Sequence, residues 1–387
     1  MKVMASGDHH VALGSRWSEC VRVHDWIVEQ VHRHQPDLFV SGGDVYDRAS
    51  TPREREFAAE HFARIGNVCP VAIVKGNHDA NLDLKILGEL RSKHPIVVEE
   101  GVSVRTFGGV AVALMAWPDR ARLAAYAGTE HGVEGLDQDA RAALQAVMRG
   151  LGQQLAKHRG PKVAVGHWQV DGCMTSTGQP LVGHGMSIGL ADLALLGADF
   201  LVMSHIHMPQ EFCINGAPAV YCGSPYRTSF GEEEAKSIVL AEFDERGLKA
   251  WQRIETPATP MQLFELTFNP ETGNFFGRDG QRLERMVGVA GAEVRFRYHV
   301  DAEHRDAARA AAEEWDAWLL RSAADVKVEE CVRPKSTARA PEVALAKGLA
   351  PKLTAYWQAR GTMPEPARAE RLLSMAGELE GEVARAS

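Results

Sequence analysis

Six short runs of apolar, often β-branched residues recur through the first two thirds of the 387-residue chain. Each run is continuous rather than alternating with polar residues, which is typical of strands covered on both faces. Apolar residues at helical spacing separate the first three runs. This β-α-β-α-β order predicts a layered α/β domain. The runs are residues 2–6, 37–41, 71–74, 163–165, 200–203 and 219–222.

The pattern changes after Pro257 and Pro260. Alternating runs, an Ala-rich helical stretch and a last β-rich run predict a small α+β unit. From Arg333 to Arg371 the chain has eight Lys and Arg residues and only three Glu residues. We therefore predict three parts: a layered α/β domain over residues 1–255, an α+β cap over 256–333 and a basic, partly helical tail over 334–387.

The net charge of −8 argues against a protein whose whole surface coats a polyanion. A role on nucleic acid would then need local basic surface, bound cations or a partner. The six cysteines form no C-x-x-C pair, which favours plain buried thiols over a disulfide framework. The apolar runs are too short to span a bilayer, and Asp8 interrupts any secretory leader, so we expect a cytoplasmic protein without a membrane segment.

Metal-type ligands follow five of the apolar runs. Because strand carboxyl ends converge on one crevice in an open α/β sheet, five loops can build a single site. His205 and His207, two residues apart at a strand end, should place both rings on one face. Carboxylate, amide and imidazole ligands suit Mn²⁺, Fe or Zn²⁺ rather than Ca²⁺. The clusters are Asp8-His9-His10, Gly43-Asp44-Val45-Tyr46-Asp47, Gly76-Asn77-His78-Asp79, Gly166-His167 and Ser204-His205-Ile206-His207.

Each cluster has a simpler explanation when it is taken alone. Asp8 and His10 fit a surface turn, Gly43-Asp44 a β-turn and Gly76–Asp79 an Asx-turn, while His167 fits a hydrogen-bonded core histidine. The occurrence of all five clusters in one chain, each directly after a strand, favours a dinuclear metal site.

The ordered patterns D-x-H, G-D-x-x-D, G-N-H-D, G-H and S-H-x-H resemble those of calcineurin-like metallophosphoesterases. Residues 204–210, 221–225 and 230–232 are similar to the later motifs of SbcD-type DNA nuclease subunits. The resemblance implies an α/β layered metallophosphoesterase fold, with central β-sheets flanked by helices, a small α+β cap and a C-terminal helical tail. Three features depart from the family. The first motif begins Asp-His-His-Val, and Ser204 stands in place of Gly. Residues 171–189 do not align with the family's pattern, and His184 among them is expected to be a loop residue.

The resemblance also implies which residues hold two divalent ions, with Asp44 as the bridging carboxylate. Manganese is the metal it favours, while Mg²⁺, Fe²⁺ and Zn²⁺ stay open. The ligands other than Asp44 form two sets, which are Asp8, His10 and His207 for the first ion and Asn77, His167 and His205 for the second.

Three further residues receive roles by resemblance and by their position. His78 is the candidate that stabilises the pentavalent phosphorus or protonates the leaving oxygen. Asp79 beside it would orient and charge the His78 ring. Asp47 would orient a metal-binding histidine rather than bind metal itself.

The implied function is a metal-dependent DNA exonuclease or endonuclease that hydrolyses phosphodiester bonds with two metal ions, in repair and recombination. The implied partners are DNA, a second copy of the chain and an SbcC-like coiled-coil ATPase. A cyclic-nucleotide or phosphoprotein phosphatase is the alternative, because Gly43–Arg48 also fits the phosphatase pattern G-D-x-x-D-R. A non-catalytic scaffold is the third hypothesis, but such a protein would be expected to lack some of the seven ligands.

Apolar residues at helical spacing accompany the basic residues of the tail. They predict an amphipathic segment that docks a partner or DNA, or else packs on its own domain. These residues are Leu345, Leu349, Leu353, Tyr356 and Trp357.

Overall fold

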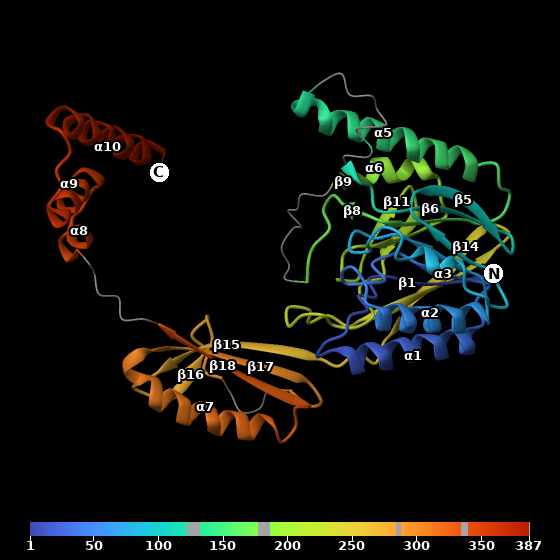
Figure 1. Cartoon of the computed structure of the whole chain (residues 1–387), viewed down its shortest axis with the longest axis horizontal. Helices are drawn as coiled ribbons and strands as arrows, with labels where there is room; N and C mark the ends of the chain where they lie inside the picture. Colours follow the sequence, from blue (N-terminus) through green and yellow to red (C-terminus); the bar gives the residue numbers. More distant parts are fainter. Residues whose placement is uncertain (121–122, 124–131, 177–185, 284–287, 334–339, 387) are drawn as a thin grey trace.

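The computed structural model describes residues 1–120, 123, 132–176, 186–283, 288–333 and 340–386. Its first 255 residues contain two six-stranded sheets that pack face to face (Figure 1). The first sheet has the order β14-β13-β1-β2-β3-β4, and its central strands β1, β2 and β3 are parallel. These strands are β1 (Lys2–Ser6), β2 (Leu38–Ser41), β3 (Val71–Val74), β4 (Ile96–Glu99), β13 (Ser237–Asp244) and β14 (Gly247–Glu255).

The second sheet has the order β11-β12-β10-β7-β6-β5, with β6, β7, β10 and β12 parallel. Its strands are β5 (Val102–Phe107), β6 (Val110–Met115), β7 (Lys162–His167), β10 (Phe200–Ser204), β11 (Gln210–Ile214) and β12 (Ala217–Tyr221). The continuous apolar runs are explained by this arrangement, because both faces of the central strands are covered. One face packs on the other sheet and the opposite face packs on helices.

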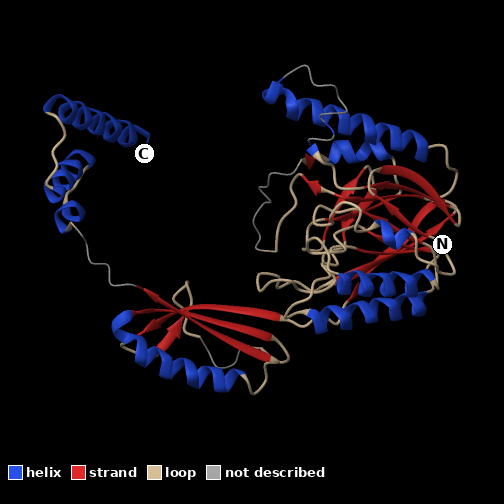
Figure 2. Cartoon of the chain, in the orientation of Figure 1, coloured by secondary structure: helices blue, strands red, loops and turns tan. Residues whose placement is uncertain are grey.

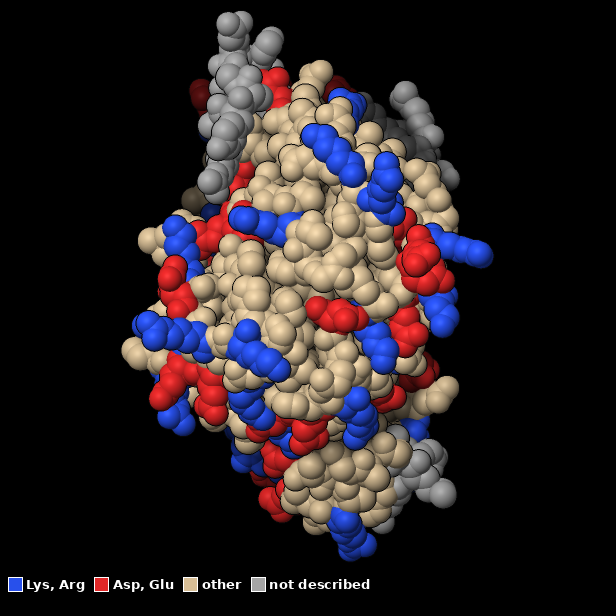
Figure 3. Space-filling view, turned by 90° about the vertical axis from the view of Figure 1, so that its right-hand side faces the viewer, with Lys and Arg blue, Asp and Glu red and all other residues tan. Residues whose placement is uncertain are grey.

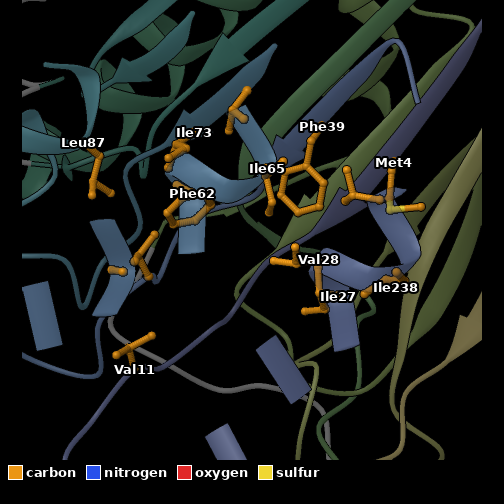
Figure 4. Packing of buried hydrophobic residues seen from close by; sticks show 14 of the residues in the cluster. Met4, Val11, Ile27, Val28, Phe39, Phe62, Ile65, Ile73, Leu87 and Ile238 are labelled. Atoms are coloured by element: carbon orange, nitrogen blue, oxygen red, sulfur yellow. The ribbon is translucent and has the colours of Figure 1, made fainter. Parts of the chain in front are cut away.

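Helices cover the two outer faces (Figure 2). Helices α1 (Trp17–His34) and α2 (Pro52–Gly66) pack on the first sheet, where Ile27, Phe62 and Ile65 contact strand residues such as Phe39 (Figure 4). A capping box begins α2, in which the Thr51 hydroxyl accepts from Glu54 N and the Glu54 carboxylate accepts from Thr51 N.

On the opposite side, α5 (Gly132–Leu155) and α6 (Leu190–Leu193) cover the second sheet. Three shorter elements complete this part of the chain: α3 (Lys85–Gly88), the 3₁₀ turn η1 (Ala194–Leu196) and a two-stranded sheet of β8 (Gln169–Val170) and β9 (Ser187–Ile188). The fold is therefore the layered α/β arrangement that the sequence predicts, with helices outside and two sheets inside.

A third sheet, with the order β16-β15-β17-β18, forms the α+β unit after residue 260. Its inner face alternates as expected, and Val294, Phe296 and Tyr298 pack against Trp315 of the helix. The unit contacts the preceding part through an ion pair of Arg16 with Glu293. Its elements are β15 (Met261–Asn269), β16 (Asn274–Phe276), β17 (Glu293–Asp301), η2 (Ala302–His304), α7 (Arg305–Leu319) and β18 (Asp325–Arg333).

The tail is helical, as the sequence predicts, and it consists of three separate helices. It forms α8 (Pro341–Leu345), α9 (Leu349–Arg360) and α10 (Pro366–Ala386), which stand apart from the other layers in Figure 1. Helix α8 ends at Leu345 because Ala346 is extended, and Gly348, with φ of 97°, precedes α9. Leu345 is 81% exposed, whereas Trp357 is buried. Within the described residues, no helix combines the length and the apolar character that crossing a membrane requires.

Candidate metal centre

The topology gathers the five ligand clusters at one end of the sheet pair. Strands β1, β2 and β3 are parallel neighbours, so the loops that follow them emerge at the same edge and carry Asp8, Asp44 and Asn77. Strands β7 and β10 are parallel neighbours in the second sheet and lead into His167 and His205. The site therefore lies between two sheets rather than at the edge of one sheet.

Four of the candidate ligands have a positive φ that is uncommon for residues other than glycine. The angles are 49° at Asp8, 43° at His10, 48° at Asp44 and 103° at His205. Such backbone costs of order 1–3 kcal/mol per residue and persists where the surroundings determine it. Here the two loops support each other, because Asp8 N donates to Gly43 O at 2.9 Å and His10 N donates to Asp44 O at 3.0 Å.

Two glycine contacts explain how the loops approach so closely. A Cβ at Gly76 would lie 2.0 Å from Asp44 Oδ1, so any side chain there would displace this carboxylate. A Cβ at Gly42 would lie 2.0 Å from the Ser204 hydroxyl. Ser204, which stands where the family usually has Gly, is therefore accommodated by the glycine that faces it.

The first group of candidate ligands is Asp8, His10 and His207, whose donor atoms lie within 4.8 Å of one another. His10 Nδ1 donates to Asp47 Oδ1 at 3.2 Å, and His207 Nδ1 donates to Glu232 Oε1 at 3.3 Å. With both Nδ1 atoms donating, both Nε2 atoms present lone pairs, and they face each other at 2.9 Å. Two ring nitrogens at this distance are satisfied either by a shared proton or by a metal ion that both of them bind.

The second group is Asp44, His167 and His205, joined by the Asn77 side chain. His167 Nδ1 donates to Gly42 O at 2.9 Å, which directs Nε2 toward Asp44 Oδ2 at 3.2 Å and Asn77 Oδ1 at 2.9 Å. His205 Nδ1 lies 2.8 Å from the same Asn77 oxygen. Asp44 Oδ2 is also 3.9 Å from His10 Nε2, so this carboxylate lies between the two groups.

The prediction that the His205 and His207 rings lie on one face of the strand end is wrong. Strand β10 ends at Ser204, and the positive φ of His205 turns the backbone away from the strand path. The His205 ring consequently joins Asn77 in one group, and the His207 ring joins His10 in the other.

Burial makes the charges of this site costly. Burial raises the pKa of Asp8, although His167 and His207 oppose the shift. Burial also acts to raise the pKa of Asp44, but the nearby His167 outweighs it and holds that pKa well below its usual range. For His167, burial is outweighed by Asp44 and Asp8, which raise its pKa to about 9. The two buried carboxylates thus attract whatever positive charge the site can hold.

His78 lies beside this centre, with its ring 5.0 Å from the His10 ring. Its Nδ1 donates to Asp47 O at 2.8 Å, which leaves Nε2 available for proton transfer. Its backbone N–H donates to Asp44 Oδ1 at 2.8 Å. The ring therefore lies next to the candidate ligands, and its Nε2 makes no hydrogen bond with Asp47.

Asp79 does not have the position expected of a group that orients the His78 ring. Its two carboxylate oxygens accept from Tyr46 N at 3.0 Å and Gly76 N at 2.9 Å. Burial and the Asp44 charge raise the pKa of Asp79 to about 7. Asp79 thus ties the loop after β3 to the loop after β2, and Asp47 is the residue that contacts His78. The contact expected of Asp47 with a histidine is present at His10.

Glu232 is a functional candidate that sequence reasoning missed, although it belongs to the Phe-Gly-Glu segment. It is buried and accepts from His207 Nδ1, from the Thr228 hydroxyl at 2.6 Å and from Lys236 Nζ at 2.6 Å. Trp117, also missed, places its ring 4.7 Å from the His205 ring. His184, expected to be a loop residue, lies outside the described residues.

The donors present fit divalent metal ions. Carboxylate, amide oxygen and imidazole are ligands that Mn²⁺, Fe²⁺ and Zn²⁺ accept, and no thiolate belongs to the two groups. His10 and His207 each donate their second ring nitrogen to a carboxylate, an arrangement typical of metal-binding histidines.

Comparison with known families agrees with the site. The calcineurin-like phosphoesterase family matches residues 1–209, which is more than half of the chain. The chain belongs to the calcineurin-like phosphoesterase family. This family uses divalent metals, and its matched residues include every candidate ligand described above.

Two curated relatives are named as SbcD subunits of the nuclease SbcCD. The one from Bacillus subtilis is 24% identical over 277 residues, covering 66% of this chain and 69% of the relative. The one from Staphylococcus epidermidis is 24% identical over 255 residues, and the match spans 63% of its length and 60% of this chain. These relatives support the resemblance to SbcD-type proteins, and the enzyme class is a phosphoesterase.

Solved structures of lower similarity include a Thermus thermophilus protein with 13% identity and a TM-score of 0.40, covering 65% of this chain and 98% of that one. A dimetal phosphatase from Danio rerio is 12% identical with a TM-score of 0.41, covering 66% of this chain and 96% of that one.

Glu232→Gln tests the contact to His207. The amide oxygen can still accept a hydrogen bond, but the substitution removes the charge that makes the His207 ring a stronger ligand. We expect metal affinity to fall by ~10–100-fold, measured by titration of the metal-free protein. Glu234→Gln is the matched control, because Glu234 also pairs with Lys236 at 2.6 Å but does not contact His207. Equal affinities for the two variants would contradict this role of Glu232.

Proposed function

We propose that this chain is a metal-dependent nuclease that hydrolyses phosphodiester bonds of DNA. The observation that carries the proposal is the single cluster formed by seven candidate ligands, with His78 at its edge. The two relatives are named as nuclease subunits, which supports a nucleic acid as the substrate, and the resemblance to SbcD-type DNA nucleases supports DNA.

The residues divide between two ions. Asp8, His10 and His207 would hold the first, Asn77, His167 and His205 would hold the second, and Asp44 would contact both. Two bound divalent ions neutralise the charge of a phosphodiester and activate water for attack on phosphorus. Manganese is the metal we expect.

The protein itself contributes orientation and proton transfer. Asp47 O accepts from His78 Nδ1, which fixes the ring so that Nε2 can donate a proton to the oxygen that leaves phosphorus. Asp47 and Glu232 fix the tautomers of His10 and His207, so that their Nε2 atoms face the centre. Asp79 holds the loops after β2 and β3 together, which keeps His78 next to Asp44.

Surface charge limits how this enzyme would hold DNA. On the face drawn in Figure 3, basic and acidic side chains are interspersed rather than separated. This agrees with the net charge of −8, which does not attract a polyanion. We therefore propose that long DNA is held with a partner, an SbcC-like coiled-coil ATPase.

Asp44→Ala tests the shared carboxylate. Because Asp44 lies between both ligand groups, its loss should remove hydrolysis of bis-nitrophenyl phosphate and of DNA ends and weaken both ions. Asp244→Ala, which removes an exposed carboxylate at the end of β13, should behave as the parent. Near-normal activity with full metal occupancy in Asp44→Ala would contradict the assignment of a dinuclear site. Cleavage of the small diester by the parent without any cleavage of DNA would favour the phosphatase alternative.

His78→Asn separates binding from chemistry. The variant should retain its metal content and DNA affinity, while turnover falls by ~10²–10⁴-fold through loss of proton transfer or electrostatic stabilisation. His32→Asn on the exposed side of α1 serves as the control. Loss of metal from His78→Asn would instead make His78 a ligand.

Removal of the tail tests partner docking. Helices α9 and α10 contact each other, partly through Leu349 N donating to Glu380, and Trp357 of α9 is buried. Leu345, Met363 and Leu379 are exposed, which leaves apolar surface for a partner. A chain that ends at Lys335 should still cleave a small phosphodiester in Mn²⁺ but no longer bind the ATPase or long DNA. Loss of small-substrate activity or of folding would show that the tail belongs to the core.

A further inference from the structure

A second histidine cluster lies beneath the candidate metal centre, on the side of the helices. It consists of His9 in the loop after β1, His24 on α1 and His61 on α2, and all three residues are at most 3% exposed. One ring nitrogen of each lies within 4.8 Å of the others. None of the three belongs to the two ligand groups described above.

Hydrogen bonding leaves several nitrogens of this cluster without a partner. His24 Nδ1 donates to Cys20 O at 2.7 Å, so its Nε2 carries a lone pair. That lone pair accepts a hydrogen bond from His9 Nδ1 at 3.1 Å, and an ion bound between the two nitrogens would replace this shared proton. Among the described residues, His9 Nε2 and both ring nitrogens of His61 have no hydrogen-bond partner. Buried polar atoms are normally paired, so three orphan nitrogens in one cluster point to a missing ligand.

The spacing fits a zinc-type ion. Two imidazole nitrogens bonded at 2.0–2.1 Å in tetrahedral geometry stand about 3.3 Å apart. The observed 3.1 Å between His9 Nδ1 and His24 Nε2 is close to this value. His61 can turn toward the pair without breaking a hydrogen bond, because neither of its nitrogens makes one. Burial lowers the pKa of His24 to about 4, so its ring is neutral and able to bind metal at neutral pH.

A cavity of about 310 Å³ between the two helices borders the cluster and is lined by Trp17, Phe57 and His61, among other residues. Of the three histidines, His61 is the one that lines this cavity. A three-histidine site with one open position matches the ligand number of many zinc sites.

We propose that His9, His24 and His61 bind one additional Zn²⁺-type ion. The ion would join α1 and α2 to the segment that carries Asp8 and His10, and thereby stabilise the left-handed backbone of both residues. The alternative is plain aromatic packing, since the rings also contact Phe57 and Phe62 edge-on. A bound ion would accept a lone pair of His61, which aromatic packing alone leaves without a partner.

The test counts bound ions in the full-length chain. Metal-free protein is loaded with Zn²⁺, dialysed and analysed for metal, comparing the parent with His61→Phe and with the exposed control His32→Phe. We expect His61→Phe to bind one ion fewer, while His32→Phe matches the parent. The same difference of one ion should appear when both His61 forms are compared in an Asp44→Ala background, so the result does not depend on the proposed nuclease function.

Thermal unfolding provides a second measurement. Zn²⁺ should raise the unfolding midpoint of Asp44→Ala more than that of Asp44→Ala combined with His61→Phe, because any weakened binding at the main centre is common to both variants. If His61→Phe fails to fold, anomalous diffraction at the zinc edge on parent crystals decides, with a peak expected among the three imidazoles. Equal ion counts in the parent and a folded His61→Phe, or no anomalous peak there, would overturn the proposal.

Discussion

The buried carboxylate of Asp8 is the interaction on which the rest of this site depends. It follows β1 of the first sheet, yet both of its oxygens accept from His205 N after β10 of the second sheet, at 2.9 and 3.1 Å. A single side chain therefore fastens the loops of two sheets together. Asp44 does the same within the first sheet by accepting from His78 N. Both carboxylates are almost fully buried, so their negative charges must be compensated inside the site.

The histidines supply part of this compensation, and their orientation indicates how the rest is provided. His167 has a raised pKa because it lies between Asp44 and Asp8. His10 and His207 direct their lone pairs toward each other, since Asp47 and Glu232 accept from the opposite ring nitrogens. A protonated cluster and a metal-bound cluster meet the same electrostatic need, and the family to which the chain belongs uses divalent metals. The strained backbone of four candidate ligands has the same origin, because the loops are held where these donors converge.

Much of this arrangement could be predicted from sequence, because strands covered on both faces are continuous apolar runs and the ligands follow them directly. Other features could not, because they depend on contacts between distant segments. Asp79 is adjacent to His78 in sequence, yet its carboxylate turns inward to two backbone amides. Glu232 reaches His207 across 25 positions, and His9 meets His24 and His61 only after two helices pack. The helix break that begins at the extended Ala346 separates Leu345 from α9, and helical spacing does not reveal it.

The central claim is that Asp44 is shared by two ions in one centre. Electron paramagnetic resonance of the protein loaded with two equivalents of Mn²⁺ tests it most directly. Ions about 3.5–4 Å apart with a bridging carboxylate should give an exchange-coupled spectrum. That spectrum should be replaced by the signal of isolated Mn²⁺ when Asp44 is changed to Ala. An isolated-ion spectrum in the fully loaded parent protein would contradict the account.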